Sequence, residues 1–297
     1  MRSIKNISQV TKALEAVSAS KVRKAQQAVM NTRAYARKAY QVLQHLGMQP
    51  GTAASLHPLL AKHESVKNIT VVLITSDRGL CGAYNTNMVR AAMAFVREHK
   101  DVPVKFIAVG KKGRDLLLRR KQTIIGEFVN LPGNPSFANI SPIGRMAVEE
   151  FLSARADEVY LGYTDYVNTL RQEPRFKLLL PLKPEGQEAQ EATGHRTAQL
   201  AASAKGPAAA YIYEPSQEGL LDVIVPRFTE LQVYQSILEA QASEHSARMV
   251  AMRNATDSAK DLLGSLQIQY NKARQLSITS DLLDIVGGVE ALAKAKG

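Results

Sequence analysis

The chain has 297 residues, of which 45% are hydrophobic and 6% aromatic, and its formal net charge is +11. This composition is typical of a soluble protein with its own apolar core, and no apolar run approaches the roughly 18 residues of a membrane span. Cys81 is the only cysteine, which excludes an intramolecular disulfide and a cysteine-based zinc site and favours a reducing compartment. The first residues lack the apolar core of a signal peptide, so we expect a protein that is not secreted.

The positive charge lies mainly in the N-terminal segment. Residues 1–45 contain nine Lys and Arg residues against one Glu, a net charge of +8, whereas residues 220–297 contain eight against nine acidic residues, a net charge of −1. A basic segment attracts nucleic acid, anionic lipid or an acidic protein surface. The charge alone does not choose among these partners.

Residues 1–46 are predicted to form a coiled-coil helix. The stretch from Ile4 to Leu46 contains no Pro or Gly and is rich in the helix formers Ala, Lys, Gln and Arg. Its apolar residues alternate at three- and four-residue spacing, as in a coiled-coil seam, at Ile7, Val10, Leu14 and Val17 and then at Val22, Ala25 and Val29. Gly47 and Pro50 end the helix, and residues 47–67 are interpreted as a linker.

Residues 68–214 are predicted to form a small α/β domain. Short β-branched or apolar runs indicate strands at Ile69–Thr75, Lys105–Val109, Glu158–Gly162, Phe176–Leu180 and Tyr211–Tyr213. Helical patterns lie between them at Thr86–His99, Gly113–Arg120 and Ser141–Ala154. This alternation predicts a Rossmann-like, mostly parallel sheet with helices on its faces. Residues 183–207 lack periodicity and are expected to form a mobile loop of this domain.

Residues 215–297 are predicted to form a C-terminal coiled-coil helix, with no proline after Pro226. A three-four alternation runs from Leu231 to Leu276 and gives a left-handed supercoil with a partner helix. Three successive seam positions are polar, which suggests that another chain surrounds this part of the helix, at Gln241, His245 and Arg248. The predicted fold is therefore an α/β domain bracketed by the antiparallel N- and C-terminal helices of a long α-helical coiled coil. The longer C-terminal helix is expected to extend beyond its partner.

The stretch ITVVLITSDRGLCGAYNTNMV has the strand, glycine loop and helix order of a phosphate-binding site. A dinucleotide fingerprint needs three spaced glycines and an acidic residue about 20 positions later, whereas this loop offers only Gly79 and Gly82. Asp77 also places a carboxylate where a phosphate would bind. We therefore interpret Asp77, Gly79 and Gly82 as a structural turn, in which the glycines supply backbone freedom and Asp77 and Asn85 cap the turn.

No catalytic or metal-binding constellation is evident in the sequence. Cys81 is predicted to be a packed thiol rather than a nucleophile, because no activating base is evident near it. None of the six His residues has the i, i+4 spacing of a metal-binding pair. We therefore predict no cofactor, metal or small-molecule ligand. Two alternatives stay open, a nucleotide-dependent enzyme built on the α/β domain and a basic coiled-coil protein that binds nucleic acid.

The gamma subunit of the rotary F-type ATP synthase is similar to this chain in three stretches. These are KNISQVTKALEAVSASKVRKAQ, SDRGLCGAYNTN and SARMVAMRNATDSAKDLLGSLQIQYNKARQLSITSDLLDIVGGVEAL, in the order of the chain. The resemblance implies a non-catalytic central rotor shaft that couples ion flow through the membrane ring to ATP synthesis or hydrolysis at the beta subunits. It implies the alpha, beta and epsilon subunits and the membrane c-ring as partners, and no nucleic acid. The implied location is peripheral, on the cytoplasmic face of the bacterial plasma membrane.

The same resemblance implies contacts with a catch loop of the beta subunit. In KARQLSIT, the residues Arg274, Gln275 and Thr279 match positions that meet this loop. Asp281 stands close by, where Glu is common in the family.

A second implied contact is with an acidic lever loop of the beta subunit. In TKALEAV, Leu14 matches a position, often Met, that faces this lever. In ARMVAM, Arg248 matches a basic partner of the same lever.

Overall fold

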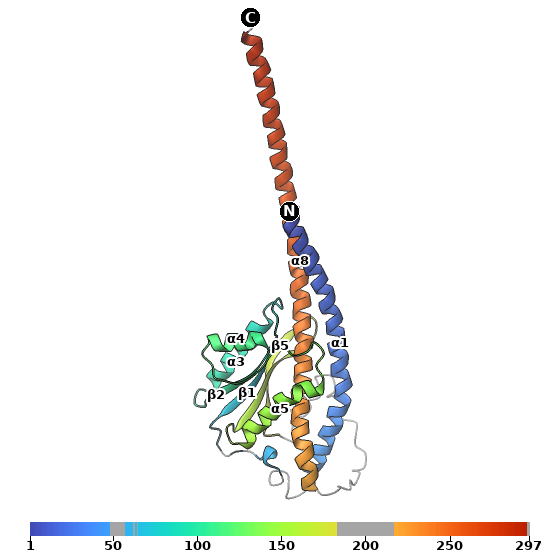
Figure 1. Cartoon of the computed structure of the whole chain (residues 1–297), viewed down its shortest axis with the longest axis vertical. Coiled ribbons are helices and arrows are strands. Elements are labelled where there is room, and N and C mark those ends of the chain that lie inside the picture. The colour runs from blue at the N-terminus through green and yellow to red at the C-terminus, as the bar shows by residue number, and fades with distance from the viewer. Residues whose placement is uncertain (48–56, 62, 64, 183–216, 296–297) are drawn as a thin grey trace. The chain divides into compact units, whose positions relative to one another are not determined.

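The structure, a computed structural model, describes residues 1–47, 57–61, 63, 65–182 and 217–295 (Figure 1). Its elements are α1 (Arg2–Gly47), the short 3-10 helix η1 (Pro58–Leu60), β1 (Ile69–Ile74), α3 (Tyr84–Glu98), β2 (Val104–Val109), α4 (Lys111–Arg119), β3 (Ile124–Phe128), α5 (Phe137–Leu152), β4 (Glu158–Tyr166), β5 (Gln172–Leu180) and α8 (Gln217–Ala295). The chain divides into a helical unit (residues 1–17 and 249–297) and a sheet unit (residues 18–248). The division of the sequence into four regions stays a prediction.

The sheet unit contains a five-stranded sheet with the strand order β3-β2-β1-β4-β5. β1 pairs in parallel with β2 and with β4, β2 pairs in parallel with β3, and β5 runs antiparallel to β4. All six residues of β1 are buried, as expected for a central strand that is covered on both faces. The predicted mostly parallel α/β fold is confirmed.

One strand of the sheet was not predicted from the sequence. β3 has only five residues, Gly126 interrupts it, and none of its residues is fully buried. Such a segment carries neither a clear alternation nor a continuous apolar run, which are the two sequence signals of a strand. The strand expected at Tyr211–Tyr213 lies outside the described residues.

The hairpin of β4 and β5 is longer than predicted. β4 continues to Tyr166 and β5 already begins at Gln172. The added pairs place Asp165 opposite Glu173 and Thr164 opposite Pro174, in a charged and proline-containing stretch outside both predicted strands. β5 lies at the edge of the described sheet, where a proline costs no ladder hydrogen bond.

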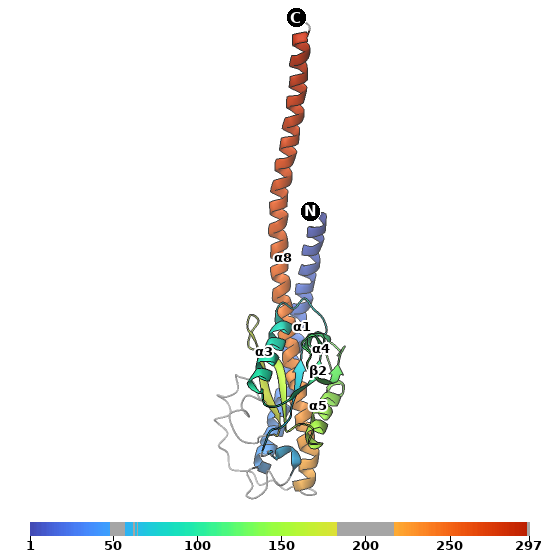
Figure 2. The ribbon, with the colours of Figure 1, turned by 90° about the vertical axis from the view of Figure 1, so that its left-hand side faces the viewer.

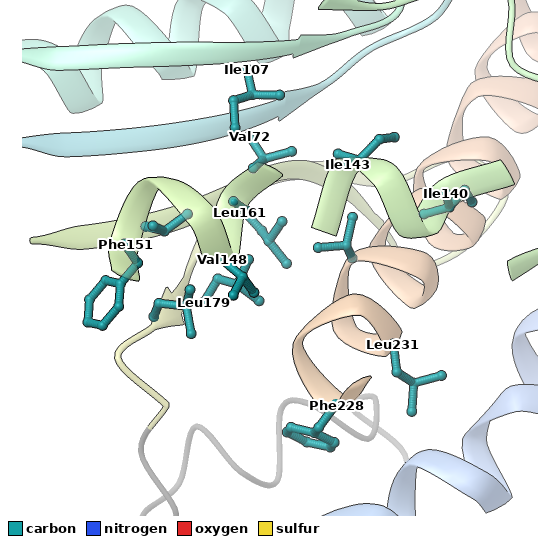
Figure 3. Close-up of a cluster of buried hydrophobic side chains, with 14 of the residues drawn as sticks. Val72, Ile107, Ile140, Ile143, Val148, Phe151, Leu161, Leu179, Phe228 and Leu231 are labelled. Carbon is teal, nitrogen blue, oxygen red and sulfur yellow. The ribbon is translucent and has the colours of Figure 1, made fainter. Parts of the chain in front are cut away.

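Helices cover both faces of the sheet (Figures 1 and 2). On one face, a cluster of buried side chains joins α3 and α4 to Val71 and Leu73 of β1. On the other face, a larger cluster joins α5 and the first part of α8 to Val72 of β1 and Ile107 of β2 (Figure 3). Because successive residues of a strand point to opposite faces, the continuous apolar run of β1 contributes to both clusters.

Glycine allows α5 and α8 to approach closely. Ile140 and Ile143 of α5 are buried in the same cluster as Phe228 of α8 (Figure 3). A Cβ on Gly144 would lie 2.9 Å from the Cα of Glu230, closer than real side chains come to a backbone atom. α8 therefore packs against the bare backbone of α5 at this position.

The helical unit pairs the first residues of α1 with α8 in antiparallel orientation, as predicted. Thr11 Oγ1 lies 2.7 Å from Thr256 Oγ1, and Arg253 Nε donates a hydrogen bond to Glu15 Oε1 at 2.8 Å. Residue numbers therefore rise along α1 as they fall along α8.

The seam between these two helices matches the predicted one only in part. Ile7, Val10 and Val17 are each more than half exposed, so the prediction that they form the seam was wrong. The predicted Leu14 is half-buried, as is Thr11, which was not predicted. A small hydroxyl side chain lets the helices come close and finds a hydrogen-bond partner across the seam, which the apolar spacing of the sequence does not reveal. The later predicted residues of α1, which belong to the sheet unit, are buried: Val22, Ala25 and Val29.

The predicted stripe on α8 holds over part of its length. Met252 and Ala259 are buried, whereas Leu262 and Leu276 are exposed. Among the described residues of the helical unit, no second helix covers α8 beyond this point. The C-terminal part of α8 is therefore exposed, as expected for the longer of the two helices.

Two matched Gly→Ala changes are expected to have opposite effects on stability. Gly144→Ala would press a methyl group against the backbone of α8 and is expected to cost about 1–3 kcal/mol. Gly264→Ala adds a Cβ that meets no atom within 4 Å, so better helix propensity is expected to contribute about 0.5–1 kcal/mol. Urea unfolding followed by circular dichroism measures both free energies. Equal changes for the two variants would contradict the close α5–α8 contact.

Candidate functional site

The glycine turn (residues 76–82) joins β1 to α3 and reaches the start of α4. The Asp77 carboxylate accepts a hydrogen bond from the Lys111 N–H at 2.9 Å, and the Ser76 carbonyl accepts one from the Lys112 N–H at 3.0 Å. Thr75 Oγ1 accepts the next one, from the Gly113 N–H at 3.0 Å. N–H groups at the N-terminus of a helix, here α4, are donors that can bind an anion. Protein groups already occupy all three.

Of the two glycines that were predicted to supply backbone freedom, Gly82 adopts the left-handed conformation and Gly79 does not. Leu80 has a φ of 63° and Gly82 a φ of 57°, whereas Gly79 is not among the residues with positive φ. A Cβ on Gly79 would meet only the end of the Lys112 side chain, at 3.9 Å. Neither backbone conformation nor packing within the described residues therefore requires glycine at position 79. Leucine in this region costs about 1–2 kcal/mol, so Leu80 strains the turn.

The inner side of the turn is packed and unreactive. Asn85 Oδ1 accepts a hydrogen bond from the Ser76 N–H at 3.0 Å, and Asn85 Nδ2 donates to Cys81 Sγ at 3.2 Å. Burial raises the pKa of the Cys81 thiol, and the hydrogen bond with Ser76 only partly opposes this. A thiol with a raised pKa is a poor nucleophile, which agrees with the predicted packed cysteine.

Arg248 of α8 holds the glycine turn from its outer side. The Arg248 guanidinium donates to the Gly79 carbonyl at 3.3 Å, to the Arg78 carbonyl at 3.4 Å and to Glu244 Oε1 at 2.7 Å. The Arg248 and Glu244 side chains are only 11% and 15% exposed. The expectation that another chain must surround this polar seam position was therefore wrong, because the same chain supplies its surroundings.

Burial and neighbouring charges shift the pKa values of the two titratable groups that contact Arg248, Glu244 and His245. Burial raises the pKa of Glu244, and the charge and hydrogen bond of Arg248 counteract this. Burial, together with the charges of Arg248 and Lys21, lowers the pKa of His245 to about 4. His245 is therefore neutral, and its Nδ1, 3.3 Å from Arg248 Nη1, accepts a hydrogen bond from the guanidinium, which can only donate.

α8 lies across the edge of the sheet where open α/β folds bind their ligands, outside the carboxyl ends of the strands. Tyr84 Oη donates to the Ala240 carbonyl at 3.1 Å, and Ser243 Oγ donates to the Thr164 carbonyl at 2.9 Å. The cavity left between α8, the glycine turn and the ends of β1 and β2 has a volume of about 190 Å³. Ligand pockets typically measure about 300–1,000 Å³, so a nucleotide does not fit. Among the described residues, no group of three or more His, Cys, Asp or Glu is placed to hold a metal ion.

The remaining predicted contact residues lie in the helical unit. Leu14 is half-buried on α1, and Arg274, Gln275, Thr279 and Asp281 are exposed on α8. The spacing of these four residues places them on one broad face of the helix. Their contact with a beta subunit stays a prediction, as does that of Leu14.

This part of α8 also exposes many large apolar side chains. They are Leu262, Ile268, Leu276, Ile278, Leu282, Leu283, Ile285, Val286 and Val289. Contiguous apolar surface of this kind marks a protein interface rather than a solvated helix. Residues 262–289 therefore form a candidate partner-binding surface.

Comparisons with known proteins agree with these features. The family model described as ATP synthase matches residues 1–292. A curated relative from Herpetosiphon aurantiacus, named ATP synthase gamma chain, is 42% identical over 98% of this chain and 96% of the relative. The chain belongs to the ATP synthase gamma chain family. A relative of the same name from Dehalococcoides mccartyi is 43% identical over 99% of this chain and 96% of its own length, and the resemblance inferred from the sequence is confirmed.

Solved structures of ATP synthases contain the same fold. A chain of the Euglena gracilis mitochondrial ATP synthase has a TM-score of 0.63 at 21% identity and matches 100% of this chain and 94% of its own length. A chain of the Tetrahymena thermophila central stalk and c-ring has a TM-score of 0.62 at 23% identity and matches 83% of this chain and 99% of its own length. In the part of this family member that the structure describes, no helix is long and apolar enough to cross a membrane.

Sequence reasoning missed the residues that fasten α8 to the sheet. Glu244 and Ser243 on α8 were not singled out, although they contact Arg248 and the end of β4. The sequence did indicate an unusual contact here, because polar residues occupy the seam positions Gln241, His245 and Arg248 of α8. It could not show which segment of the chain faces them.

Arg248→Ala is expected to lower the free energy of unfolding by about 3 kcal/mol, because it leaves the Glu244 carboxylate buried without its cation. The folded-state pKa of Glu244 already lies above its unfolded value of 4.5 and would rise further. An acid whose pKa is raised in the folded state contributes stability below its unfolded pKa, and this contribution is lost as pH rises through its folded pKa. The free energy of unfolding that Arg248→Ala removes is therefore expected to be larger at pH 7 than at pH 5. Urea unfolding at both pH values measures this difference.

The matched control is the double variant Arg248→Ala with Glu244→Gln, which removes the buried charge. It is expected to recover part of the stability and to abolish the extra loss at pH 7. An equal loss for the single variant at both pH values would show that the ion pair is not the cause.

Proposed function

We propose that this chain is the central rotor shaft of an F-type ATP synthase. It rotates inside a ring of alpha and beta subunits and couples ion flow through the membrane ring to ATP synthesis or hydrolysis at the beta subunits. The observation that carries this proposal is identity of 42–43% to ATP synthase gamma chains over nearly the whole chain. The partners are the alpha, beta and epsilon subunits and the c-ring. The complex lies on the cytoplasmic face of a bacterial plasma membrane, with this chain as a peripheral component.

The chain itself is not catalytic. The crevice that would hold a nucleotide in an α/β fold is covered by α8, and the N–H groups at the start of α4 are taken by protein acceptors. The shaft acts instead as a moving ligand. A surface that differs around its axis favours a different conformation of each beta subunit, and rotation changes which subunit meets which face.

The exposed part of α8 suits a shaft that turns against stationary subunits. Its apolar residues can make non-directional hydrophobic contacts with the surrounding subunits. Such contacts do not hold the helix at one angle of rotation, as directional bonds would. Charged groups such as Arg274 and Asp281 are exposed, and exposed ion pairs contribute less than about 1 kcal/mol. Such pairs form and break readily as the partner changes at every third of a turn.

Torque also has to pass between α8 and the sheet. Within the sheet unit, α8 is fixed by its apolar contacts with α5 and by side-chain bonds to backbone carbonyls, such as those of Ser243 and Arg248. Bonds to backbone carbonyls connect the helix to the frame of the sheet rather than to mobile side chains. This part of the chain is therefore suited to turn as one body.

Reconstitution tests the proposal. The chain is mixed with purified alpha and beta subunits, and particle mass and magnesium-ATP hydrolysis are measured. We expect a stable particle with one copy of this chain and restored multi-site hydrolysis. The rotor function would be refuted if the chain stays apart from the other subunits and binds a ligand alone. Binding of ATP would favour a nucleotide-dependent enzyme, and binding of nucleic acid that weakens with salt would favour a basic coiled-coil protein that binds nucleic acid.

Substitution of the residues that are predicted to contact the catch loop of the beta subunit provides a second test. Arg274→Ala combined with Gln275→Ala is expected to slow ATP hydrolysis by the particle about tenfold, because contacts that act during rotation are lost. Both residues are exposed, so the melting temperature of the isolated chain is expected to stay within a few degrees of the parent. Lys260→Ala, an exposed change elsewhere on α8, is the control. Unchanged turnover would remove the assigned role of these two residues.

A further inference from the structure

Glu230 on α8 is a buried carboxylate that the rotor function leaves unexplained. Its side chain is 6% exposed and accepts hydrogen bonds from Ser141 Oγ at 2.8 Å, from Arg145 Nε at 3.4 Å and from Arg227 Nη1 at 3.4 Å. The two arginine side chains, by contrast, are 68% and 58% exposed. Burying a charge is costly, so a carboxylate at this position is not explained by packing alone.

The guanidinium groups of both arginines are held in place. Arg145 and Arg227 approach opposite oxygens of the same carboxylate. The Arg227 guanidinium also lies 6.0 Å from the centre of the Phe137 ring, and this ring packs edge-on against Tyr234. Groups that are ordered before a partner arrives lose less entropy when the partner binds.

A cavity of about 190 Å³ opens between these groups, beside the core contact of α5 and α8 seen in Figure 3. It is lined by Phe137, Ala138, Ser141, Pro142, Arg145 and Arg227. Among the described residues, no acidic side chain lines it, and Glu230 beneath it compensates only one of the two positive charges. The cavity therefore combines mostly apolar walls with one uncompensated positive charge.

We propose that this cavity receives an acidic side chain, Asp or Glu, of another subunit of the assembly, and that Arg145 and Arg227 bind its carboxylate. The proposal rests on the proposed function, because it takes the partner to be a protein of the same complex. Each guanidinium uses one N–H on Glu230 and keeps further donors for a second carboxylate. Arginine in a pocket with aromatic walls is typical of the residues that dominate binding energy at protein interfaces.

The cavity suits a side chain better than a free phosphate. Phe137, Ala138 and Pro142 offer apolar contact to the methylene stem of an acidic residue, which a phosphate ion lacks. One uncompensated positive charge also matches the single negative charge of a carboxylate. Guanidinium and carboxylate groups pair with matched planar geometry.

The same contacts also connect α5 to α8, and a purely structural role makes different predictions. A structural connection predicts that loss of an arginine destabilises the isolated chain and leaves subunit affinity unchanged. Docking predicts the reverse once Glu230→Gln has removed the buried charge that the arginines compensate, because both arginines are themselves largely exposed. Arg155 offers a matched control, since it is 50% exposed and lies 2.8 Å from the buried Glu150 but does not line the cavity.

The first experiment measures affinity in the reconstituted complex. The variants are made with Glu230→Gln, because loss of both arginines would otherwise leave a buried carboxylate without a cation. In this background, Arg145→Ala combined with Arg227→Ala is expected to weaken binding of the chain to its partner subunits about tenfold or more, with little change in its melting temperature. Arg155→Ala is expected to change the affinity less than about twofold. A loss of melting temperature without a loss of affinity would overturn the proposal in favour of a structural connection.

The second experiment identifies the partner group by zero-length carbodiimide cross-linking, which joins an amine to a carboxylate in contact with it. Arg145→Lys and Arg227→Lys are made separately with Glu230→Gln, so that Glu230 does not consume the new amine. Mass spectrometry of the reconstituted complex is expected to find an amide bond to an Asp or Glu of another subunit. The control, Arg155→Lys with Glu150→Gln, is expected to give no such bond.

Each outcome decides the matter. A link only within the chain, only between two copies of it, or equally frequent in the control overturns the proposal. Restored hydrolysis without an intersubunit link at these positions overturns this inference and leaves the rotor function intact. Failure of the complex to assemble refutes the rotor function, and the inference falls with it.

Discussion

The attachment of α8 across the carboxyl edge of the sheet is the constraint on which the rest of the structure depends. α8 is one helix with two environments, largely buried in the sheet unit and exposed from about residue 262 onward. In the sheet unit, its apolar residues join the core, and Ser243, Ser246 and Arg248 donate to backbone carbonyls of neighbouring segments. Core packing supplies most of the adhesion, whereas the polar bonds fix the position and rotation of the helix.

This attachment also decides what the α/β domain can do. A mostly parallel sheet with a glycine-containing turn after its central strand is the usual frame of a nucleotide site. Here α8 covers the crevice, and Asp77 places its own negative charge at the N-terminus of α4, a helix end that attracts anions. The described residues thus have the frame of a nucleotide site with its crevice covered. The fold alone therefore does not establish the function.

The sequence predicted the elements that local residue patterns determine. It failed where contacts between residues far apart in the chain determine the structure. β1 and β2 were predicted within one residue, because their β-branched runs are bounded by turns. The N-terminal helix followed from its lack of Pro and Gly, and the C-terminal helix from the lack of Pro after Pro226 and from its three-four alternation. β3 was missed because its pairing with β2, rather than its own composition, makes it a strand. The seam of α1 was partly misplaced because Thr11 meets Thr256, a contact between residues 245 positions apart. The bond from Arg248 to Gly79 spans 169 positions and was equally invisible.

Two buried glutamates on α8 show how one chemical group serves different ends. Glu244 and its cation Arg248 are both shielded from solvent. Their charges therefore interact with each other, and Arg248 also binds the glycine turn. Glu230 is shielded to a similar degree, but both of its arginines remain largely exposed. A carboxylate that orients cations without covering them leaves positive charge available at the surface. The first arrangement strengthens the connection of helix and sheet, whereas the second prepares the α5 side of the domain for an acidic partner.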